Sequence, residues 1–292
     1  MNDIYLSQIA IIIVLFHPSE SDIDNIHILS KRYKGVIVDN SEKDTFDDSH
    51  IGRMLYLPLK GNHGIAEAHN QAIDLICQEN EVKYIVLLDQ DSRLTEDYPL
   101  KIVNEFIQIK EHHPLLVALG PTIIQKETGE EYRSAIHHDR YIESNFILKK
   151  DIIASGCGLS IEGIKTVGKF DSSLFIDFVD TEWCYRAKSK GFIFGITPHI
   201  TLRHKVGQNE IHIGKHIVSI SAPFRYYYQY RNLTILLFRR YVPFSFKINF
   251  GIKFLLRLFY FPLFVKDGRK CWKYMLKGIF NGLKTITTKN IL

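Results

Sequence analysis

The sequence predicts an α/β fold: a mostly parallel central sheet with helices on both faces, followed by a C-terminal helical appendage that is basic and aromatic. In the first 115 residues, short apolar runs alternate with segments of helical apolar spacing, which is typical of βαβ units. From about residue 223, aromatic residues alternate with Lys and Arg instead. These observations divide the chain into an α/β part, residues 1–224, and a tail, residues 225–292.

The strand at residues 9–16 is the clearest element, because its apolar run is continuous and rich in β-branched residues. Such a run is typical of a parallel strand that is buried on both faces. Further strands are expected at residues 35–38, 54–57 and 84–88, and helices at 21–31, 64–79 and 99–110. Residues 147–159 and 192–204 are expected to contain strands, with a helix near 180–190.

The composition is that of an ordinary globular chain, with 46% hydrophobic and 24% charged residues. The four cysteines are scattered and form no C-x-x-C pair, which argues against a zinc site and a disulfide framework and fits a reducing compartment. The apolar run at 9–16 is short and follows no cationic segment, so we expect no secretory signal. The longest uncharged stretch of the tail has eight residues, whereas a spanning helix needs about 20.

The charge is divided unevenly along the chain. From Arg225 to the end there are 14 Lys and Arg residues but one acid, Asp267, whereas the preceding residues carry 23 basic and 31 acidic side chains. Such a division suggests an acidic body and a basic tail that faces an anionic partner.

Clusters that contain polar side chains follow three of the expected strands. Phe16 and His17 end the first, Asp39 ends the second, and Asp89 and Asp91 follow the strand at 84–88. In open parallel sheets, ligands bind outside the carboxyl ends of the strands. We therefore expect a ligand site at this edge of the sheet.

Asp89 and Asp91 are spaced so that both carboxylates can face the same way once the strand bends into a turn. A hard divalent cation prefers such oxygen ligands and completes its shell with water and substrate phosphates. Bound there, a cation would stabilise a diphosphate leaving group. A turn or a helix cap would use the same residue types, so the pair alone is a weak signal.

Two further polar segments suggest nucleotide binding. The carboxylate of Asp39 can accept the N3–H of a uracil or thymine ring, although an Asx turn explains it as well. Gly64 would let the backbone approach a ligand, and the helix that begins there has an N-terminus suited to phosphate. An ordinary capped helix explains that second segment equally well.

Residues 175–186 place Asp177, Asp180 and Glu182 among large apolar side chains. Burial raises the pKa of a carboxyl and makes it a better base near neutral pH. The alternative is an amphipathic helix that begins with Asp180 as its N-cap. His204 follows the apolar segment 192–202 and could complete a metal site, although a lone histidine is more often structural.

The order of these motifs resembles family 2 glycosyltransferases of the GT-A fold, a Rossmann-like α/β fold. Within that family it is most similar to bacterial rhamnosyltransferases of O-antigen and other surface polysaccharides. The resemblance covers about residues 9–240. The motifs that carry it are DNS (39–41), GNHGIAEAHN (61–70), LLDQDS (87–92), ASGCG (154–158), FIDFVDTEWCYR (175–186), HKVG (204–207) and RYYYQYRN (225–232).

The resemblance implies an inverting glycosyltransferase that needs Mg²⁺ or Mn²⁺. The nucleoside-diphosphate sugar would bind to the first half of the α/β part, about residues 1–115. The acceptor would bind to the second half, about residues 116–224. The implied donor is dTDP-β-L-rhamnose, and the implied acceptor is a lipid-linked saccharide of O-antigen (lipopolysaccharide) synthesis. The implied location is peripheral, at the cytoplasmic face of the plasma membrane.

The resemblance also assigns roles to residues of this sequence. Asp180 matches the catalytic aspartate, with Asp177 and Glu182 as candidates for support. The donor would contact Phe16, His17, Asp39, Asn62, Gly64, Ala66, Asn70 and Asp89. Asp91 and His204 would hold the metal, with Asp89 as a third candidate. The acceptor would contact Gly156, Cys157, Gly158 and Trp183.

Two positions depart from the family pattern. Ser41 stands where a glycine is frequent, so the turn after Asp39 is expected to differ. Val179 replaces the acid that usually precedes the catalytic aspartate, as in the rhamnosyl subgroup, which leaves open whether Asp177 shares the role of the base.

The tail is expected to bind an anionic membrane surface rather than nucleic acid, because basic amphipathic helices lie in the headgroup plane. A helical hairpin that packs on the body or on a second subunit is the alternative, so a homo-oligomer stays open. Other donors, such as UDP-galactofuranose or UDP-glucose, also stay open. A sugar nucleotidyltransferase would typically have a Gly-rich loop after the first strand, where this chain has HPSES. A non-catalytic membrane scaffold would not need to keep Asp89, Asp91, Asp180 and His204 together.

Overall fold

The computed structural model describes residues 5–92, 94–125, 140–143, 145–204, 209–213 and 216–288. Within these ranges, the side chains of residues 125, 140–143, 204, 209–213 and 216–220 lie outside the description. The predicted metal ligand His204 is therefore placed by its backbone alone.

The first half of the chain forms the parallel part of a large sheet. Four strands run parallel to their neighbours in the order β4-β2-β1-β5, and β3 lies antiparallel at the edge. The strands are β1 (Ile9–Leu15), β2 (Lys34–Asp39), β3 (His50–Ile51), β4 (Met54–Pro58) and β5 (Tyr84–Asp89). All residues of β1 are buried, as expected for its continuous apolar run.

The second half extends this sheet to the order β3-β4-β2-β1-β5-β9-β6-β10-β8-β7. Its strands are β6 (Leu116–Gln125), β7 (Arg140–Glu143), β8 (Phe146–Leu148), β9 (Gly158–Ser160) and β10 (Ile193–His204). β6 and β10 are parallel, whereas the short β9 lies antiparallel to both β5 and β6 and joins the two halves. The predicted fold class is confirmed, but the second half is more mixed than the first.

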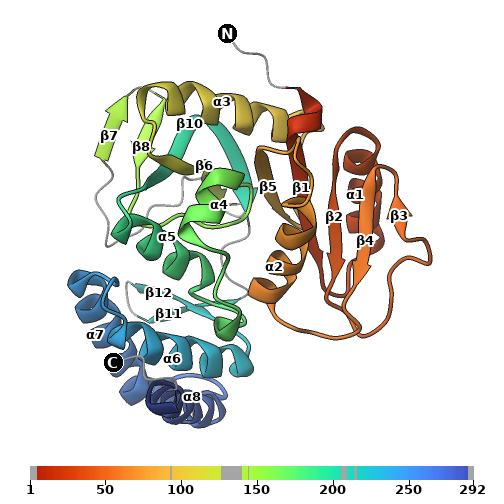
Figure 1. Ribbon diagram of the computed structural model, residues 1–292. Helices are drawn as coiled ribbons and strands as arrows, with labels where there is room; N and C mark the ends of the chain where they lie inside the picture. Colours follow the sequence, from red (N-terminus) through yellow and green to blue (C-terminus); the bar gives the residue numbers. More distant parts are fainter. Residues whose placement is uncertain are drawn as a thin grey trace.

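Helices cover both faces of the sheet (Figure 1). One core lies between the sheet and α1 (Glu20–Arg32) and α3 (Tyr98–His112), and includes Ile11 and Ile13 of β1. The other core includes the intervening residues Ala10 and Ile12. It is covered by α2 (Ile65–Ile76), α4 (Ile161–Val167) and α5 (Val179–Ser189). Alternate side chains of β1 thus enter opposite cores, as the two-residue period of a strand requires.

The remaining elements are short connections and the tail. The 3₁₀ turns are η1 (Leu6–Gln8) and η2 (Ser172–Leu174), and β11 (Asn209–Ile213) pairs with β12 (His216–Ile220) in a separate hairpin. The tail is helical as predicted, with α6 (Pro223–Phe238), α7 (Phe244–Phe264) and α8 (Gly268–Thr288) below the sheet in Figure 1. Over the part of the chain that the structure describes, no helix is long and apolar enough to cross a membrane.

Candidate functional site

The ends of β1, β2 and β5 meet at one edge of the sheet, where the sequence predicted a ligand site. The backbone N–H of Phe16 donates to the side-chain oxygen of Gln90 at 2.7 Å, and the Gln90 amide donates back to the Phe16 carbonyl at 3.3 Å. The backbone N–H of His17 donates to the Ser41 hydroxyl at 2.9 Å. Ser41, which departs from the family pattern, therefore ties the loops after β1 and β2 together.

Asp39 is buried at the end of β2, and its carboxylate is held by a small network. One oxygen accepts from the Ser41 backbone at 3.0 Å, and the other from the Thr45 backbone at 2.9 Å and the Tyr56 hydroxyl at 2.8 Å. Burial raises the pKa of Asp39, but the hydrogen bonds from Thr45, Ser41 and Tyr56 outweigh it and lower that pKa overall. The carboxylate is therefore buried and held by its own neighbours, and the predicted contact with a ring N3–H stays a prediction.

The start of α2 lies against the backbone of Phe175, and the expected phosphate contact there stays a prediction. The N–H of Ile65 donates to the Phe175 carbonyl at 2.8 Å. Gly64 has φ +85, and a Cβ at that position would lie 2.6 Å from the ring of Phe175. The close approach of Phe175 therefore requires glycine at this position.

The other predicted donor contacts on this helix are also engaged within the protein. Ala66 lies in the core. The Asn70 amide donates to the Phe170 carbonyl at 2.8 Å and accepts from the Phe170 N–H at 3.0 Å. Asn62 accepts from the Gly64 N–H at 3.0 Å, just before the helix begins. These contacts fix α2 against the segment that leads to Asp180.

Asp180 lies in the first turn of α5, and it does not cap that helix. The N-cap is Phe178, with φ 63 and ψ 9, and it makes no side-chain cap hydrogen bond. The half-buried Asp180 carboxylate instead accepts from the Ala154 N–H at 3.1 Å. Burial raises the pKa of Asp180 to about 6, and the nearby charges of Asp151 and Asp89 add to that rise.

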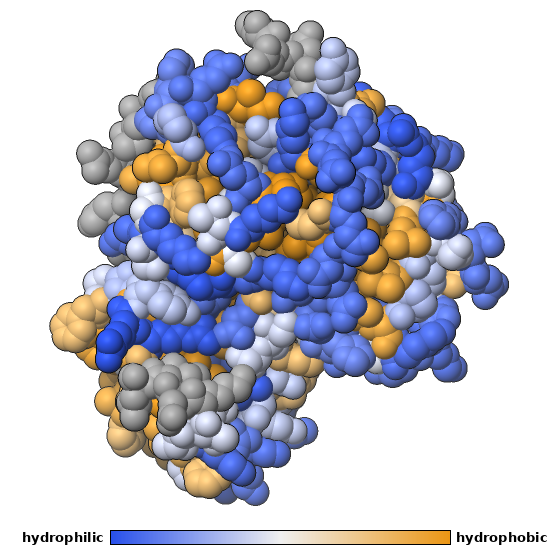
Figure 2. Space-filling model, viewed as in Figure 1, coloured by the Kyte–Doolittle hydropathy of each residue, from blue (hydrophilic) through white to orange (hydrophobic). Residues whose placement is uncertain are grey.

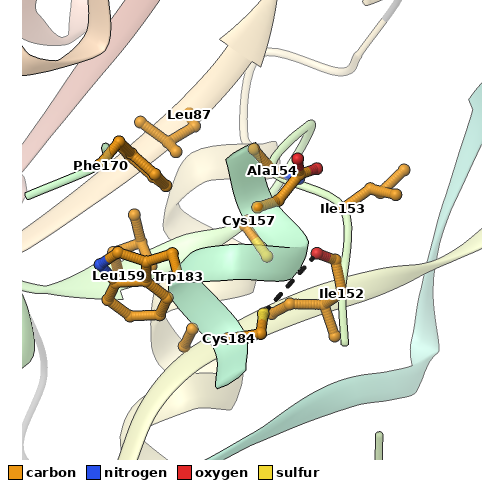
Figure 3. A pocket seen from close by; sticks show the side chains of 11 residues that line it. Leu87, Ile152, Ile153, Ala154, Cys157, Leu159, Phe170, Trp183 and Cys184 are labelled. Carbon is orange, nitrogen blue, oxygen red and sulfur yellow. Dashed lines mark hydrogen bonds between the residues drawn. The ribbon is translucent and has the colours of Figure 1, made fainter. Parts of the chain in front are cut away.

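An apolar pocket surrounds Asp180 and accounts for its raised pKa. Figure 3 shows side chains from β5, β9, α5 and the loop before β9 converging on this space. Its lining includes Leu87, Ile152, Leu159, Phe170, Trp183 and Cys184, and Asp180 is the charged member. A carboxylate in such surroundings is poorly solvated and accepts a proton more readily.

Asp177 and Glu182, the candidates for supporting Asp180, are held by arginines, among them Arg225 and Arg239 of the tail. Asp177 accepts from both Nε and Nη2 of Arg225. The buried Glu182 accepts from Arg186 at 2.9 Å and lies 3.1 Å from Arg239. Both carboxylates therefore join α6 to the α/β part, and neither lines the pocket around Asp180.

The loop before Asp180 is strained and is held by α6. Phe175, Asp177 and Phe178 have φ values of 64, 65 and 63, a region that non-glycine residues rarely adopt. The buried Asn232 amide lies within 2.8–2.9 Å of the carbonyls of residues 174, 176 and 177. Arg231 donates to the carbonyls of residues 173 and 174 at 2.7 and 2.9 Å.

The sequence interpretation missed this role of α6. The signal was present in the motif RYYYQYRN, which contains both Arg231 and Asn232. That motif was assigned to the tail because its composition is basic and aromatic. The division predicted at residues 224–225 describes composition, whereas the hydrogen bonds of α6 cross it.

The predicted acceptor residues lie beside the end of β5. Gly156 has φ +76, and a Cβ there would lie 2.5 Å from the Tyr98 hydroxyl. Cys157 lines the pocket, and Gly158 pairs with Val86 of β5 in the sheet. Trp183 also lines the pocket, and its indole N–H donates to the Gly168 carbonyl at 2.8 Å.

The metal prediction rests on the chemistry of two carboxylates. Asp89 is the last residue of β5, and Asp91 is exposed in the turn that follows. Such oxygen ligands fit a hard divalent cation. The backbone of His204 ends β10 and pairs with Gln125. Among the residues with described side chains, no group of three or more His, Cys, Asp or Glu is arranged to hold a metal ion.

Comparison with known proteins supports the predicted class. The chain is 29% identical to the dTDP-rhamnosyl transferase RfbF of Shigella flexneri, with 96% of this chain and 97% of that protein covered. No family model matches the sequence. The expected resemblance to rhamnosyltransferases is thus confirmed over nearly the full length of both chains.

Solved structures show the same fold at low sequence identity. The crystal structure of S. aureus TarS matches with a TM-score of 0.56 and 15% identity over 94% of this chain. This chain spans about half, 49%, of that TarS chain. GalNAc-T7 with UDP, GalNAc and Mn²⁺ matches with a TM-score of 0.56 and 11% identity, covering 97% of this chain and 57% of that one. The predicted GT-A fold is confirmed.

Proposed function

We propose that the chain transfers L-rhamnose from dTDP-β-L-rhamnose to a hydroxyl of a saccharide acceptor, with inversion at the anomeric carbon. The observation that carries this proposal is Asp180, a carboxyl with a pKa near 6 in an apolar pocket that Leu87 of β5 helps to line. The similarity to a dTDP-rhamnosyl transferase along the whole chain supports the choice of donor.

In this proposal, Asp180 takes the proton of the acceptor hydroxyl as its oxygen bonds to the anomeric carbon. The bond from that carbon to the diphosphate breaks, and dTDP leaves. A base with a pKa near 6 is largely ionised at neutral pH and can still accept a proton. The Ala154 N–H, 3.1 Å from the carboxylate, fixes the orientation of that base.

The donor would lie across the ends of β1, β2 and β5. Asp39 would accept the thymine N3–H, and the loops at Phe16, His17 and Asn62 would surround the nucleoside. Asp89 and Asp91, with His204, would hold Mg²⁺ or Mn²⁺. The ion would supply positive charge to the departing diphosphate.

The acceptor we propose is a lipid-linked saccharide of surface-polysaccharide (O-antigen) synthesis. The enzyme would meet it as a peripheral protein at the cytoplasmic face of the membrane. The basic tail supports this location, since it carries 14 cationic residues and one acid.

Donor turnover tests the proposal directly. The purified chain is incubated with dTDP-rhamnose, UDP-glucose, UDP-galactofuranose and UDP-GlcNAc, each with Mg²⁺, with Mn²⁺ and with EDTA, and the release of nucleoside diphosphate is recorded. With water as the acceptor in place of the saccharide, we expect slow dTDP release in the presence of a cation and none in EDTA. Faster turnover of a UDP-sugar than of dTDP-rhamnose would contradict the proposed donor. Full turnover in EDTA would contradict the proposed metal requirement.

A further inference from the structure

Helix α7 exposes a continuous stripe of large apolar side chains. With 3.6 residues per turn, positions spaced three or four apart fall on one side of a helix. The exposed apolar residues of α7 follow this spacing, and Phe259 and Leu263 are 68% and 75% exposed. The stripe consists of Phe244, Ile248, Ile252, Leu255, Phe259 and Leu263.

Helix α8 exposes a second stripe of the same kind, with lysines beside it. The stripe consists of Trp272, Leu276, Phe280 and Leu283. Lys273, Lys277 and Lys284 are exposed and follow it along the helix. We call the two stripes and these lysines the α7–α8 face. Figure 2 shows apolar surface at the lower left of the molecule, where α7 lies in Figure 1.

The opposite side of α7 is buried in the protein. Phe246, Phe254 and Phe261 lie in a core with Tyr226 and Tyr230 of α6. Helix α7 is therefore apolar on both sides, although one side faces solvent. A helix of this kind normally lies between two apolar surroundings. An exposed apolar patch of this extent marks an interaction surface.

The charge around the α7–α8 face favours an anionic partner. Residues 244–288 contain nine Lys and Arg and a single acid, Asp267. A second copy of the chain would bring the same cationic face against itself in a two-fold symmetric contact. Like charges would oppose that contact. A lipid surface with anionic headgroups offers apolar chains and negative charge together.

We propose that the α7–α8 face docks on an anionic lipid surface, with both helices lying in the plane of the headgroups and the two apolar stripes inserted between them. This inference deepens the membrane location under the proposed function and rests on it for its biological meaning.

The docked face lies close to the loop that precedes Asp180. Phe178, the N-cap of α5, contacts the rings of Phe246, Phe250 and Phe254 on the buried side of α7, with centroids 5.6–6.0 Å apart. The thickness of one helix, about 10 Å, therefore separates the lipid surface from Phe178. A saccharide anchored in that surface would need to reach only a short way to the pocket.

Vesicle flotation with the full chain tests this docking. The probes are vesicles of phosphatidylcholine alone and of phosphatidylcholine with phosphatidylglycerol, without any saccharide. We expect the chain to float with the anionic vesicles and to remain behind with the neutral ones. The variant Phe259→Asp/Leu263→Asp should bind roughly tenfold or more weakly. Its matched control, Ile28→Asp/Leu115→Asp, changes two apolar residues that are 50% and 55% exposed on the α/β part and should bind as the wild type does.

A lysine series tests the charge separately. Lys273→Gln/Lys277→Gln/Lys284→Gln should weaken binding to anionic vesicles by roughly 10²-fold. Lys31→Gln/Lys83→Gln/Lys188→Gln removes three exposed lysines of the α/β part and should leave binding unchanged. Thermal melts confirm that each variant is folded.

The docking is contradicted if the wild type ignores anionic vesicles, or if each variant binds like its control. Light scattering adds a further outcome: a dimer that Phe259→Asp/Leu263→Asp converts to a monomer, with no vesicle binding, would assign the face to a second copy. Donor turnover is measured without lipid in parallel. Lost docking with intact turnover leaves the transferase proposal standing, and docking without turnover leaves the lipid contact standing.

Discussion

Helices α6 and α7 have the same basic and aromatic composition, yet their surroundings are opposite. In α6, Tyr226, Tyr230 and Asn232 are buried, and the polar side chains hold the loop before Asp180. In α7, six large apolar side chains along one side are exposed, among them Phe259. Composition therefore marks a tail as different from the body without saying what each helix contacts. By its contacts, α6 belongs to the catalytic part, and α7 belongs to the surface.

The largest effect expected from this comparison is at Arg239, at the end of α6. Its guanidinium is close to the carboxylates of Glu182 and Asp171. Arg239→Met would leave Glu182, which is 1% exposed, with less compensating charge. We expect the free energy of unfolding to fall by about 3–5 kcal/mol, measured by urea denaturation.

Arg240→Met is the matched control, because the neighbouring Arg240 is exposed. It should change the free energy of unfolding by no more than about 0.5 kcal/mol. Equal effects of the two substitutions would mean that α6 is not fixed to the body through Arg239.

A second test separates positioning from stability at Asn232. Asn232→Ala removes the donor that holds three backbone carbonyls of the strained loop. We expect a loss of about 2–3 kcal/mol in the free energy of unfolding. We also expect kcat to fall by about 10²-fold at a temperature where the variant is folded, because Asp180 is displaced.

The exposed Asn249 of α7 provides the control for that substitution. Asn249→Ala should leave both kcat and stability near the wild-type values. A stable Asn232→Ala variant with normal kcat would show that the loop keeps its shape without α6.

The smallest effect is expected for α7. Phe259→Asp/Leu263→Asp should leave donor turnover in lipid-free solution within about twofold of wild type. It should also change the free energy of unfolding by less than about 0.5 kcal/mol, since both side chains already face solvent. A marked loss of either quantity would place α7 within the catalytic part, and the contrast with α6 would disappear.

The sequence was sufficient where local pattern decides the structure. The strand β1 was expected within one residue, because burial on both faces leaves an unbroken apolar run. The clusters at Phe16, Asp39 and Asp89 were expected at one edge, because parallel strands end on the same side of a sheet. These inferences need no knowledge of contacts distant in the sequence.

The sequence was insufficient where contacts between residues distant in the sequence decide the structure. The strand β9 (Gly158–Ser160) is too short to show a period, and it is held between β5 and β6. Helix α5 is not capped by Asp180, because its N-cap is Phe178 in a left-handed conformation, which no local pattern predicts. The carbonyls of the residues before Phe178 accept from the Asn232 amide, which is 54 residues away from Phe178 in the sequence.

The pH dependence of turnover follows from the raised pKa of Asp180. A base must be deprotonated, so kcat should be constant above pH 7 and fall as the pH drops through about 6. A cation bound at Asp89 would offset the negative charge of that residue and move the fall to lower pH. Single-turnover rates between pH 4.5 and 8 would reveal this limb, and a rate that rises on acidification would contradict a carboxylate base.

Substitution of Asp180 by Asn tests the central claim most directly, because Asn keeps the shape and the acceptor for the Ala154 N–H but cannot take a proton. We predict that kcat falls by about 10²-fold or more. The pKa of Asp180 is higher in the folded chain than its usual 3.8, so its ionisation opposes folding above that range. Asp180→Asn should therefore raise the free energy of unfolding at pH 8 by about 1–3 kcal/mol, and this gain should vanish below pH 4. Asp177→Asn, which loses an ion pair outside the pocket, should keep more of the activity and gain no stability. Near-normal turnover by Asp180→Asn, with or without a gain in stability, would contradict the assignment of Asp180 as the base.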